Sequence, residues 1–230
     1  MSVWEEVEVA LDNIIDDYEK VNHLISLFQD NKTRLKGLSM VQPSIGSALE
    51  LGSGPGNFSR MIYNEHEGPL ICLDFSYSML SSSMKKNEEI DLFYVRGVFD
   101  ALPFRKESFN LITAAYALRD TLNIGKAVAE TYKTMKNGGK LLIIDIGKPD
   151  NRLIQGFMRF YVRYWVPIIG GIATGHGYKN SWSIIYQTFD RLPSNNSLRE
   201  LLSKFLVNVN KEEYIFGALI ILKGTKKNCG

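Results

Sequence analysis

A run of alternating glycines behind a short apolar stretch constrains the fold of this chain more than any other feature. Ala48–Leu51 is followed by Gly52, Gly54 and Gly56, and then by a segment, Asn57–Tyr63, that can form a helix. Glycines let the backbone approach a ligand closely, and the first N–H groups of the helix would face the same ligand. The stretch predicts a strand, a ligand-binding turn and a helix; an ordinary flexible loop is the alternative.

Short apolar stretches alternate with helical ones along the rest of the chain. We predict strands at 48–51, 70–74, 92–96, 110–115 and 140–146, and helices at 57–63, 78–86, 124–136 and 195–204. Asn137-Gly138-Gly139 is a signal for the end of the third of these helices. The alternation is typical of an α/β protein with a parallel sheet covered on both faces. Two closely joined final strands, at 205–210 and 218–223, should be antiparallel.

Two further segments complete the single domain, 1–230, that we predict. The N-terminal segment (1–40) is expected to be a helical cap, continuous to about Leu38, because apolar residues recur on one face. They are Val7, Leu11, Ile14, Tyr18, Val21, Ile25 and Phe28. The insert at 150–193 is rich in aromatic residues and is expected to form a lid. Its apolar part approaches the length of a membrane span, but Arg159, Arg163 and Pro167 argue against spanning.

Composition excludes several classes of function. The net charge of +2 argues against a dedicated nucleic-acid binder. The two cysteines form no disulfide framework, and the acidic N-terminus is no signal peptide, so we expect a cytoplasmic protein. The three histidines lack metal-ligand spacing, so no metal site is expected.

An acidic residue at the end of the second strand points to a nucleoside ligand. Asp74 follows the glycines by roughly twenty residues and can accept both ribose hydroxyls, while Phe75 and Phe99 can stack on adenine. A dinucleotide and S-adenosylmethionine both fit. The spacing from Glu50 through three alternating glycines differs from the dinucleotide pattern, as does the antiparallel ending, so S-adenosylmethionine is favoured.

Five stretches together are typical of one family. They are Leu49-Glu-Leu-Gly-Ser-Gly-Pro-Gly56, Ala101-Leu-Pro-Phe104 with Phe109-Asn-Leu-Ile112, Ala117-Leu-Arg-Asp120, Met135-Lys-Asn-Gly-Gly-Lys-Leu141 through Asp145 and, more weakly, Tyr18-Glu-Lys-Val-Asn22. On these residues the chain resembles the ubiquinone/menaquinone biosynthesis C-methyltransferase family of class I S-adenosylmethionine-dependent methyltransferases. The resemblance implies a Rossmann-like fold with a seven-stranded mixed sheet, order 3-2-1-4-5-7-6, an antiparallel strand 7 and a helical lid.

The same resemblance, with the reasoning above, gives the expected site. The cofactor-binding candidates are Glu50, Gly52, Ser53, Gly54, Pro55, Gly56, Asp74, Phe75, Met79, Val98, Phe99, Asp100 and Ala115. Three departures stand out: Val98 replaces an Asp that holds adenine in the family, which leaves backbone groups or Asp100 for that role. Ala115 replaces a Ser, and Asp30 replaces a His.

Arg119, Tyr18 and Asp120 are the catalytic candidates. Arg119 follows the fourth strand at the carboxyl edge, where an always-charged donor can stabilise a phenolate; the resemblance gives it a water-mediated role in proton abstraction and makes Tyr18 a gate. Substrate candidates are Asn22, Tyr116, Met158, His176 and Trp182.

The expected reaction is C-methylation of a lipophilic polyprenyl quinol in quinone biosynthesis. Alternatives are methylation of another small molecule, a cofactor-binding regulator without turnover and, more distantly, a nicotinamide dehydrogenase. Peripheral contact with the inner face of the membrane and a homodimer are also considered, the first because aromatic residues and arginines share the insert.

Overall fold

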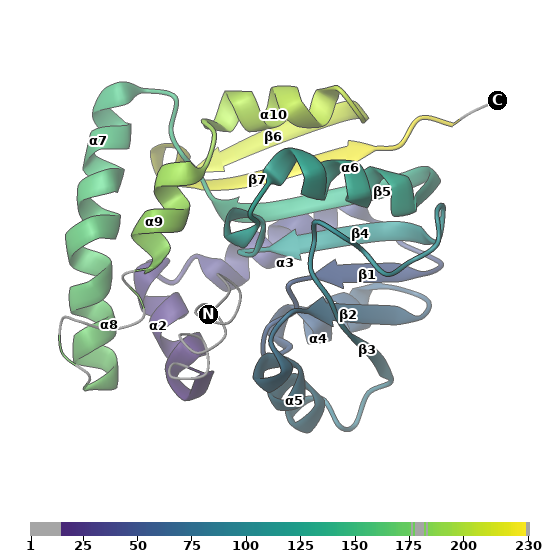
Figure 1. Cartoon of the computed structure of the whole chain (residues 1–230), viewed down its shortest axis with the longest axis horizontal. Helices are drawn as coiled ribbons and strands as arrows, with labels where there is room; N and C mark the ends of the chain where they lie inside the picture. Colours follow the sequence, from purple (N-terminus) through teal and green to yellow (C-terminus); the bar gives the residue numbers. More distant parts are fainter. Residues whose placement is uncertain (1–14, 176, 178–181, 183, 229–230) are drawn as a thin grey trace.

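A seven-stranded sheet runs through the centre of the molecule in the order β3-β2-β1-β4-β5-β7-β6 (Figure 1). The computed structural model describes residues 15–175, 177, 182 and 184–228. The strands are β1 (Ala48–Leu51), β2 (Leu70–Asp74), β3 (Leu92–Arg96), β4 (Phe109–Ala115), β5 (Met135–Ile146), β6 (Val207–Tyr214) and β7 (Leu219–Thr225). The pairs from β3 to β5 are parallel, and β7 is antiparallel to both its neighbours. The predicted α/β class, strand order and antiparallel seventh strand are confirmed.

Helices cover both faces of the sheet. They are α2 (Tyr18–Ile25), α3 (Asp30–Val41), α4 (Asn57–Glu65), α5 (Tyr77–Lys86), α6 (Ile124–Thr134), α7 (Arg152–Phe160), α8 (Val166–Thr174), α9 (Ile184–Arg191) and α10 (Asn195–Ser203). Shorter turns are η1 (Ile15–Asp17), η2 (Leu118–Asp120), the π-helical η3 (Tyr161–Trp165) and η5 (Ile215–Gly217).

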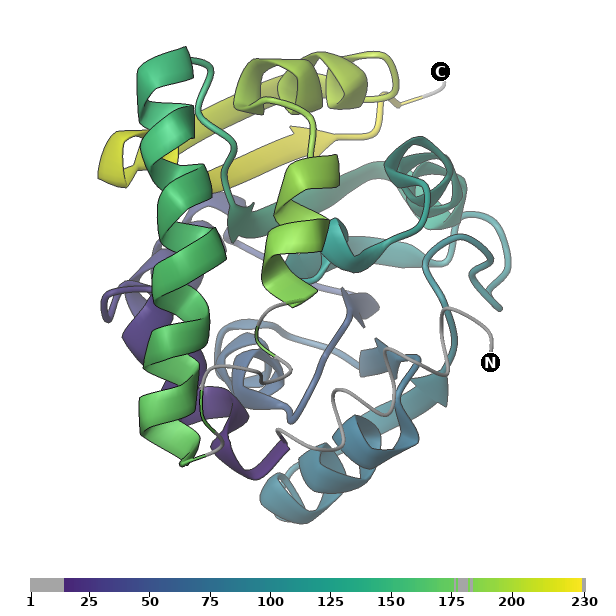
Figure 2. The same cartoon turned by 60° about the vertical axis from the view of Figure 1, so that its left-hand side comes forward.

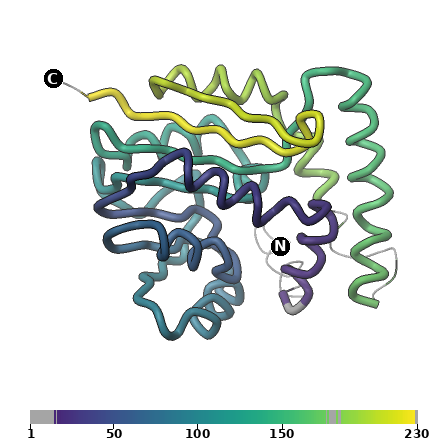
Figure 3. Tube along the Cα trace, turned by 180° about the vertical axis from the view of Figure 1, so that it is seen from behind, coloured from purple at the N-terminus to yellow at the C-terminus, as the bar shows by residue number. Residues whose placement is uncertain are grey.

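Alternate residues of each strand enter two separate cores. Leu141 and Ile143 pack in the cluster that includes residues of α6 and α10. Leu142 and Ile144 pack in the cluster formed with α3 and α4, and Figure 3, which views the molecule from behind, shows α3 crossing in front of the sheet. Burial on both faces explains why these strands read as unbroken apolar runs.

The N-terminal helix is not continuous, contrary to the sequence prediction. In the described part, α2 ends at Ile25 and α3 begins at Asp30, because Leu27 and Phe28 adopt left-handed backbone conformations (φ 53° and 61°). Phe28 is 54% exposed and is therefore not on the buried face predicted for it. Positions before Ile15 lie outside the described residues.

The end of the predicted helix at 124–136 is also different. Helix α6 ends at Thr134, and Asn137-Gly138-Gly139 lies within β5 rather than capping the helix. The β4–β5 pairing shifts register between Phe109 and Leu111. Phe109 pairs with Met135 and Leu111 with Lys140, so β5 carries extra residues at this point. Gly138 adopts a φ of 73° in this irregular stretch, which is the same conformational freedom that a helix cap would have used.

The insert between β5 and α10 forms the predicted helical lid. Elements α7, η3 and α8 make one long rod beside the carboxyl ends of the parallel strands, with α9 next to it (Figure 2). Its inner side packs on Val21 of α2 through Val162, Val166 and Phe189. None of the helices described is both long enough and apolar enough to cross a membrane.

Asn195 joins the two ends of the lid. Its side-chain oxygen accepts the Lys148 N–H at 2.7 Å, and its amide nitrogen donates to the Gly217 carbonyl at 2.9 Å. Its backbone N–H donates to the Lys148 carbonyl at 2.9 Å. The end of β5 and the start of α10 therefore lie side by side, and the lid begins and ends at one place.

Candidate active site

The three loop glycines all adopt left-handed conformations, but for different reasons. Their φ angles are 66°, 53° and 83° at Gly52, Gly54 and Gly56. A Cβ at Gly52 would lie 2.4 Å from the Ala117 Cβ, and one at Gly56 would lie 2.2 Å from the Ser83 Oγ. A Cβ at Gly54 would meet nothing within 4 Å. The outer glycines allow close packing, whereas Gly54 borders open space where a ligand can approach.

Asp74 is fixed against this loop. Its carboxylate is buried, and its Oδ2 accepts the Gly54 N–H at 2.8 Å while its Oδ1 accepts the Ser76 N–H at 3.0 Å. A carboxylate is an acceptor for hydroxyl groups. Its place beside the glycine loop, at the end of the second strand, is the one expected of an acid that binds a ribose.

Two small pockets flank the glycine loop at the carboxyl ends of β1, β2 and β4. The first, which we call the adenosine pocket, is lined by Tyr18, Gly52, Gly54, Asp74, Phe75, Met79, Gly97, Val98, Phe99, Tyr116, Ala117, Asp120 and Thr121. The second is lined by Tyr18, Glu19, Asn22, Asp30, Arg34, Glu50, Gly52, Ser53, Gly54, Pro55, Asn57, Phe58, Ala115 and Tyr116. Together they bring most of the predicted cofactor-binding residues to one place.

Buried polar atoms in these pockets indicate the kind of ligand that fits. The hydroxyl oxygens of Ser53 and Thr121 are buried and have no hydrogen-bond partner among the described residues. A buried hydroxyl without a partner is costly, so such groups usually await a ligand or water. With Asp74 for hydroxyls and Phe75 and Phe99 for a flat base, the residues present fit S-adenosylmethionine.

Glu50 links the strand before the glycine loop to the helix after it. Its side chain is buried, and the Ser59 hydroxyl of α4 donates to its Oε2 at 2.5 Å. Burial raises the pKa of Glu50 to about 8, against the opposing effect of the Ser59 hydrogen bond. The carboxyl group is therefore neutral at pH 7 and ties β1 to α4.

Arg119 is a buried cation held by a buried acid. Its Nη1 donates to the Asp145 Oδ1 at 3.0 Å, and its backbone N–H donates to the Asp145 Oδ2 at 3.2 Å. Burial alone would lower the pKa of Arg119, but Asp120 and Asp145 outweigh it and raise the pKa. Its Nε, 3.6 Å from the Asp120 Oδ1, has no hydrogen-bond partner among the described residues.

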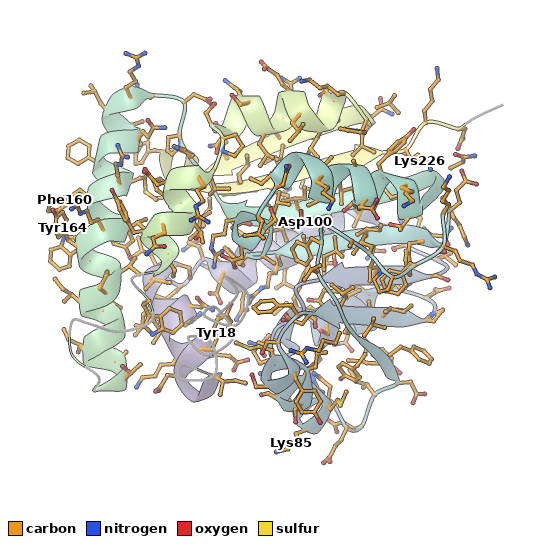
Figure 4. The ribbon with its side chains drawn as sticks, viewed as in Figure 1. Tyr18, Lys85, Asp100, Phe160, Tyr164 and Lys226 are labelled. Carbon is orange, nitrogen blue, oxygen red and sulfur yellow. The ribbon has the colours of Figure 1, made fainter. Side chains whose placement is uncertain are left out.

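Asp120 and Tyr18 face the adenosine pocket next to this cation. Although 40% of the Asp120 side chain is exposed, its surroundings in the pocket desolvate it and raise its pKa to about 6, partly opposed by Arg119. Burial also raises the pKa of Tyr18. Tyr18, labelled in Figure 4, is the first residue of α2 and lines both small pockets, so it can close them.

A larger, mostly apolar cavity of about 400 Å³ lies on the other side of Arg119, beneath the lid. We call it the acceptor cavity; its lining comprises Asn22, Ile25, Ser26, Leu27, Asp30, Arg34, Tyr116, Arg119, Ile146, Ile154, Phe157, Met158, Phe160, Tyr161, Val162, Trp165, Val166, Ile215, Phe216, Ala218 and Leu219. Its size is that of a small-molecule site.

Tyr116 lies at the junction of all three spaces. It has a left-handed backbone (φ 59°), its hydroxyl lies 2.7 Å from the Thr33 Oγ1, and the Arg34 guanidinium lies 5.2 Å from the centre of its ring. A bulky residue in this conformation is uncommon and typical of functional positions.

Several predicted site residues lie elsewhere. Gly56 packs against α5 and Asp100 lines neither pocket, whereas Val98 does line the adenosine pocket. Trp182 is 2% exposed; it packs against Gly170 and lies 5.8 Å from the Tyr18 ring, and it does not line the acceptor cavity. His176 lies outside the described residues.

Sequence reasoning missed Arg34 and the role of Asp145. Arg34 is buried, lines both the second pocket and the acceptor cavity, and its Nη1 lies 3.4 Å from the Asp30 Oδ2. The sequence did hold one indication of this role. Arg34 shares the buried side of α3 with Gly37, Leu38 and Val41, and a cation at such a position usually has a specific partner.

Comparison with known proteins agrees with this geometry. The model of the ubiE/COQ5 methyltransferase family matches residues 2–226. A demethylmenaquinone methyltransferase of Lactiplantibacillus plantarum is 28% identical, with 96% of each chain covered. A ubiquinone/menaquinone biosynthesis C-methyltransferase of Rickettsia bellii is 26% identical over 86% of this chain and 83% of that relative.

Solved structures share the fold. An S-adenosylmethionine-dependent methyltransferase of Thermotoga maritima, described as a possible histamine N-methyltransferase, superposes with a TM-score of 0.67 at 20% identity, covering 96% of this chain and all of that one. A Haemonchus contortus phosphoethanolamine N-methyltransferase solved with S-adenosylmethionine gives 0.66 at 15% identity, covering 86% of this chain and 53% of that one.

Proposed function

We propose, on the premise that the chain belongs to the ubiE/COQ5 methyltransferase family, that this S-adenosylmethionine-dependent methyltransferase methylates a ring carbon of a polyprenyl quinol. Relatives named as demethylmenaquinone methyltransferases support a demethylmenaquinol as the acceptor. The observation that carries the proposal is the apolar acceptor cavity of about 400 Å³ with the buried cation Arg119 in its wall.

The residues of the two small pockets hold the cofactor in this proposal. Asp74 accepts the ribose hydroxyls, Phe75 and Phe99 contact the adenine, and the backbone of the glycine loop supports the rest. Backbone groups near Val98 replace the side-chain carboxylate that the family uses for adenine. When bound, S-adenosylmethionine supplies a methyl group made electrophilic by its positive sulfur.

Arg119 and Asp120 act on the acceptor. A quinol ring carbon becomes a nucleophile when the neighbouring phenol loses its proton, which places negative charge on the oxygen. The free Nε of Arg119 and its fixed charge can stabilise that oxygen in a site where few waters compete. The Asp120 carboxylate, with a pKa of about 6, is ionised at pH 7 and can take the proton.

The phenol proton passes to the Asp120 carboxylate as the ring carbon attacks the methyl group that bound S-adenosylmethionine would supply. The hydrogen on that ring carbon then leaves as a proton while the phenol oxygen regains one, so the ring is aromatic again. One proton in all is released to solvent. Tyr18 and Tyr116 close the site around the reacting groups, so the main contributions of the protein are alignment and exclusion of water.

Turnover on a demethylated quinol tests the proposal. The purified protein is incubated with methyl-labelled S-adenosylmethionine and either a demethylmenaquinol or a simple catechol as a control acceptor. We expect label on the ring carbon of the quinol and little on the catechol. Cofactor binding by calorimetry without label transfer to any quinol would contradict the acceptor while leaving the family assignment in place.

A further inference from the structure

Exposed apolar side chains are distributed unevenly over the described surface. Some, such as Ile45 before β1 and Phe93 in β3, are scattered singly, which is ordinary for a soluble protein. Others gather along the long rod of the lid. We define the outer face of the lid as Leu153, Phe157, Phe160, Tyr164, Trp165, Ile168 and Ile172. Leu153 and Ile172 are 77% and 80% exposed, so most of their surface has no protein neighbour.

The outer face forms one stripe because of the π-helical segment. Its members recur mostly at four-residue steps, which in an α-helix of about 3.6 residues per turn would drift around the axis. A π-helical turn takes up more residues, so η3 in the middle of the rod reduces that drift. The Phe160 and Tyr164 rings are 5.0 Å apart, and Figure 4 shows both residues on the side of the rod that faces away from the sheet.

The mouth of the acceptor cavity continues this stripe. Leu27, Phe157, Phe160, Ile215 and Phe216 all line the cavity and are also exposed, Phe216 by 83%. They come from the α2–α3 turn, α7 and η5, which are far apart in the sequence. Apolar residues from three segments therefore surround one opening.

The turns at this mouth have an unusual backbone. Leu27, Phe28, Ile215 and Phe216 adopt φ angles of 53°, 61°, 50° and 55°. Bulky apolar residues rarely occupy the left-handed region, and such strain persists mainly where function requires it. Glycine or asparagine would relieve it at both turns. The chain instead holds large apolar side chains toward solvent at both.

The charges near the outer face are all positive along the rod. Residues 151–175 contain Arg152, Arg159 and Arg163 and no acidic residue. Arg159 pairs with Asp190 at 2.5 Å, and Arg163 lies over the rings of Tyr164 and Tyr186 at 5.4 and 5.3 Å. An apolar, aromatic helix face with arginines at its margin is typical of helices that lie in a membrane interface.

We propose that the outer face of the lid docks on the surface of a lipid bilayer, with the mouth of the acceptor cavity opening toward the acyl chains. The link to the acceptor rests on the proposed function, because a polyprenyl tail would pass from the bilayer into the cavity without crossing water. A second copy of the chain is the less suitable occupant, since it would cover the mouth. Arg152 and Arg163 add attraction to anionic headgroups, whereas the charge of Arg159 is balanced by Asp190.

Vesicle binding tests the proposal with variants outside the cavity lining. The full chain is sedimented with vesicles of phosphatidylcholine and phosphatidylglycerol, and the parent is compared with Leu153→Gln, Ile172→Gln and the double variant. Glutamine keeps helix propensity and charge. We expect each substitution to weaken partitioning about tenfold, as the loss of one buried leucine-sized side chain should. Ile45→Gln, at the amino-terminal edge of the sheet, is the matched control and should bind like the parent.

The outcomes separate this proposal from the proposed function. Equal sedimentation of parent and double variant, or equal loss in Ile45→Gln, would overturn the docking surface. A second result would also overturn it: the parent forms a concentration-dependent dimer and does not bind vesicles, and the double variant stays monomeric. The outer face would then bind a second copy of the chain. Turnover is measured in parallel on a tail-less quinol in buffer and a tailed quinol in vesicles; the double variant should lose rate only on the second. Vesicle binding without turnover on either acceptor would contradict the proposed function alone.

Discussion

The adenosine pocket and the acceptor cavity share Tyr116 but are built in opposite ways. The pocket is formed chiefly by strand ends of the sheet, and its central residues, from Gly52 to Phe99, lie close together in the sequence. Its key side chain, Asp74, has both carboxylate oxygens hydrogen-bonded to backbone amides. The cavity is mostly apolar and is assembled from the α2–α3 turn, the lid and η5. The sheet thus provides the site for a common cofactor, whereas added segments provide the site for a particular acceptor.

This contrast implies that changes on the two sides should have separable effects. Substitution of Asp74 should alter cofactor affinity, whereas substitution of Arg119 or Asp120, the ion pair between the two spaces, should alter turnover. The four predictions below test that separation, beginning with the largest effect.

Arg119→Ala should lower kcat by about 10²–10³-fold, because a fixed charge that stabilises a developing oxyanion contributes on that order. S-adenosylmethionine affinity, measured by calorimetry, should change little, since Arg119 lines the acceptor cavity and not the adenosine pocket.

The alanine variant leaves Asp145 buried without its partner, which costs about 3–5 kcal/mol of stability. Thermal unfolding therefore accompanies the assay, and Arg119→Lys, which keeps a cation, serves as the folded control. If Arg119→Ala weakens cofactor binding and keeps its turnover, Arg119 acts on the cofactor and not on the acceptor, and the prediction is wrong.

Asp120→Asn should lower kcat/KM on the order of 10²-fold, the typical contribution of a general base. In the parent, kcat/KM should fall as the pH drops through about 6, because the carboxylate that accepts the proton becomes protonated there. The asparagine variant should lack this acid limb. A pH profile that keeps its acid limb in Asp120→Asn would assign the limb to another group.

Asp74→Asn should weaken S-adenosylmethionine binding by about 10- to 100-fold, the range expected for losing hydrogen bonds to a charged group. At saturating cofactor, kcat should be close to that of the parent. Asp91→Asn, an exposed acid just before β3, is the matched control. If kcat falls while affinity is kept, Asp74 does not have the role that separates the two regions.

Glu50→Gln should give the smallest effect and should affect stability, not chemistry. Folded Glu50 keeps its proton up to about pH 8, whereas the unfolded carboxyl releases it near 4.5. The folded state therefore binds more protons between these values, and the contribution of this group to stability is lost as the pH rises through that window.

Urea unfolding at several pH values measures this dependence. The glutamine variant, which can keep the Ser59 hydrogen bond, should show a flatter profile and should lose less stability than the parent as the pH rises toward 8. Profiles of parent and variant that run parallel would mean that Glu50 is ionised in the folded protein.

The fold was predictable because its signals are local. Strands β2 and β3 have the predicted bounds, since apolar runs between turns mark buried parallel strands. The break between α2 and α3 was not predictable, because Leu27 and Phe28 are not residues that favour a left-handed turn. Hydrogen bonds from their backbone N–H groups to the carbonyls of Leu24 and His23 close this turn. The β5 irregularity at Gly138 carries the same sequence signal as a helix cap, so periodicity alone could not distinguish them.

In the candidate site, too, the predictable features are those that depend on local sequence. The proximity of Gly54 and Asp74 was predictable because Gly54 follows β1 and Asp74 ends β2, two neighbouring parallel strands; the Gly54 N–H lies 2.8 Å from the Asp74 Oδ2. Arg34 was missed because its role depends on where α3 crosses the sheet. Trp182 was expected to contact substrate because it is aromatic. It belongs instead to the buried hydrophobic cluster between the lid and α2. Aromatic character alone could not distinguish a residue of this cluster from one that lines the cavity.

The way Asn195 joins the ends of the lid has a consequence for how such enzymes diversify. Lys148 and Asn195 are joined by one backbone hydrogen bond and by one from the Lys148 N–H to the Asn195 side chain. Residues 149–194 therefore form an excursion whose two ends lie together, between β5 and α10. Such a segment can be lengthened, shortened or exchanged between proteins without moving a strand. New acceptors can therefore be acquired by replacing one contiguous stretch of gene, while the cofactor site is inherited unchanged.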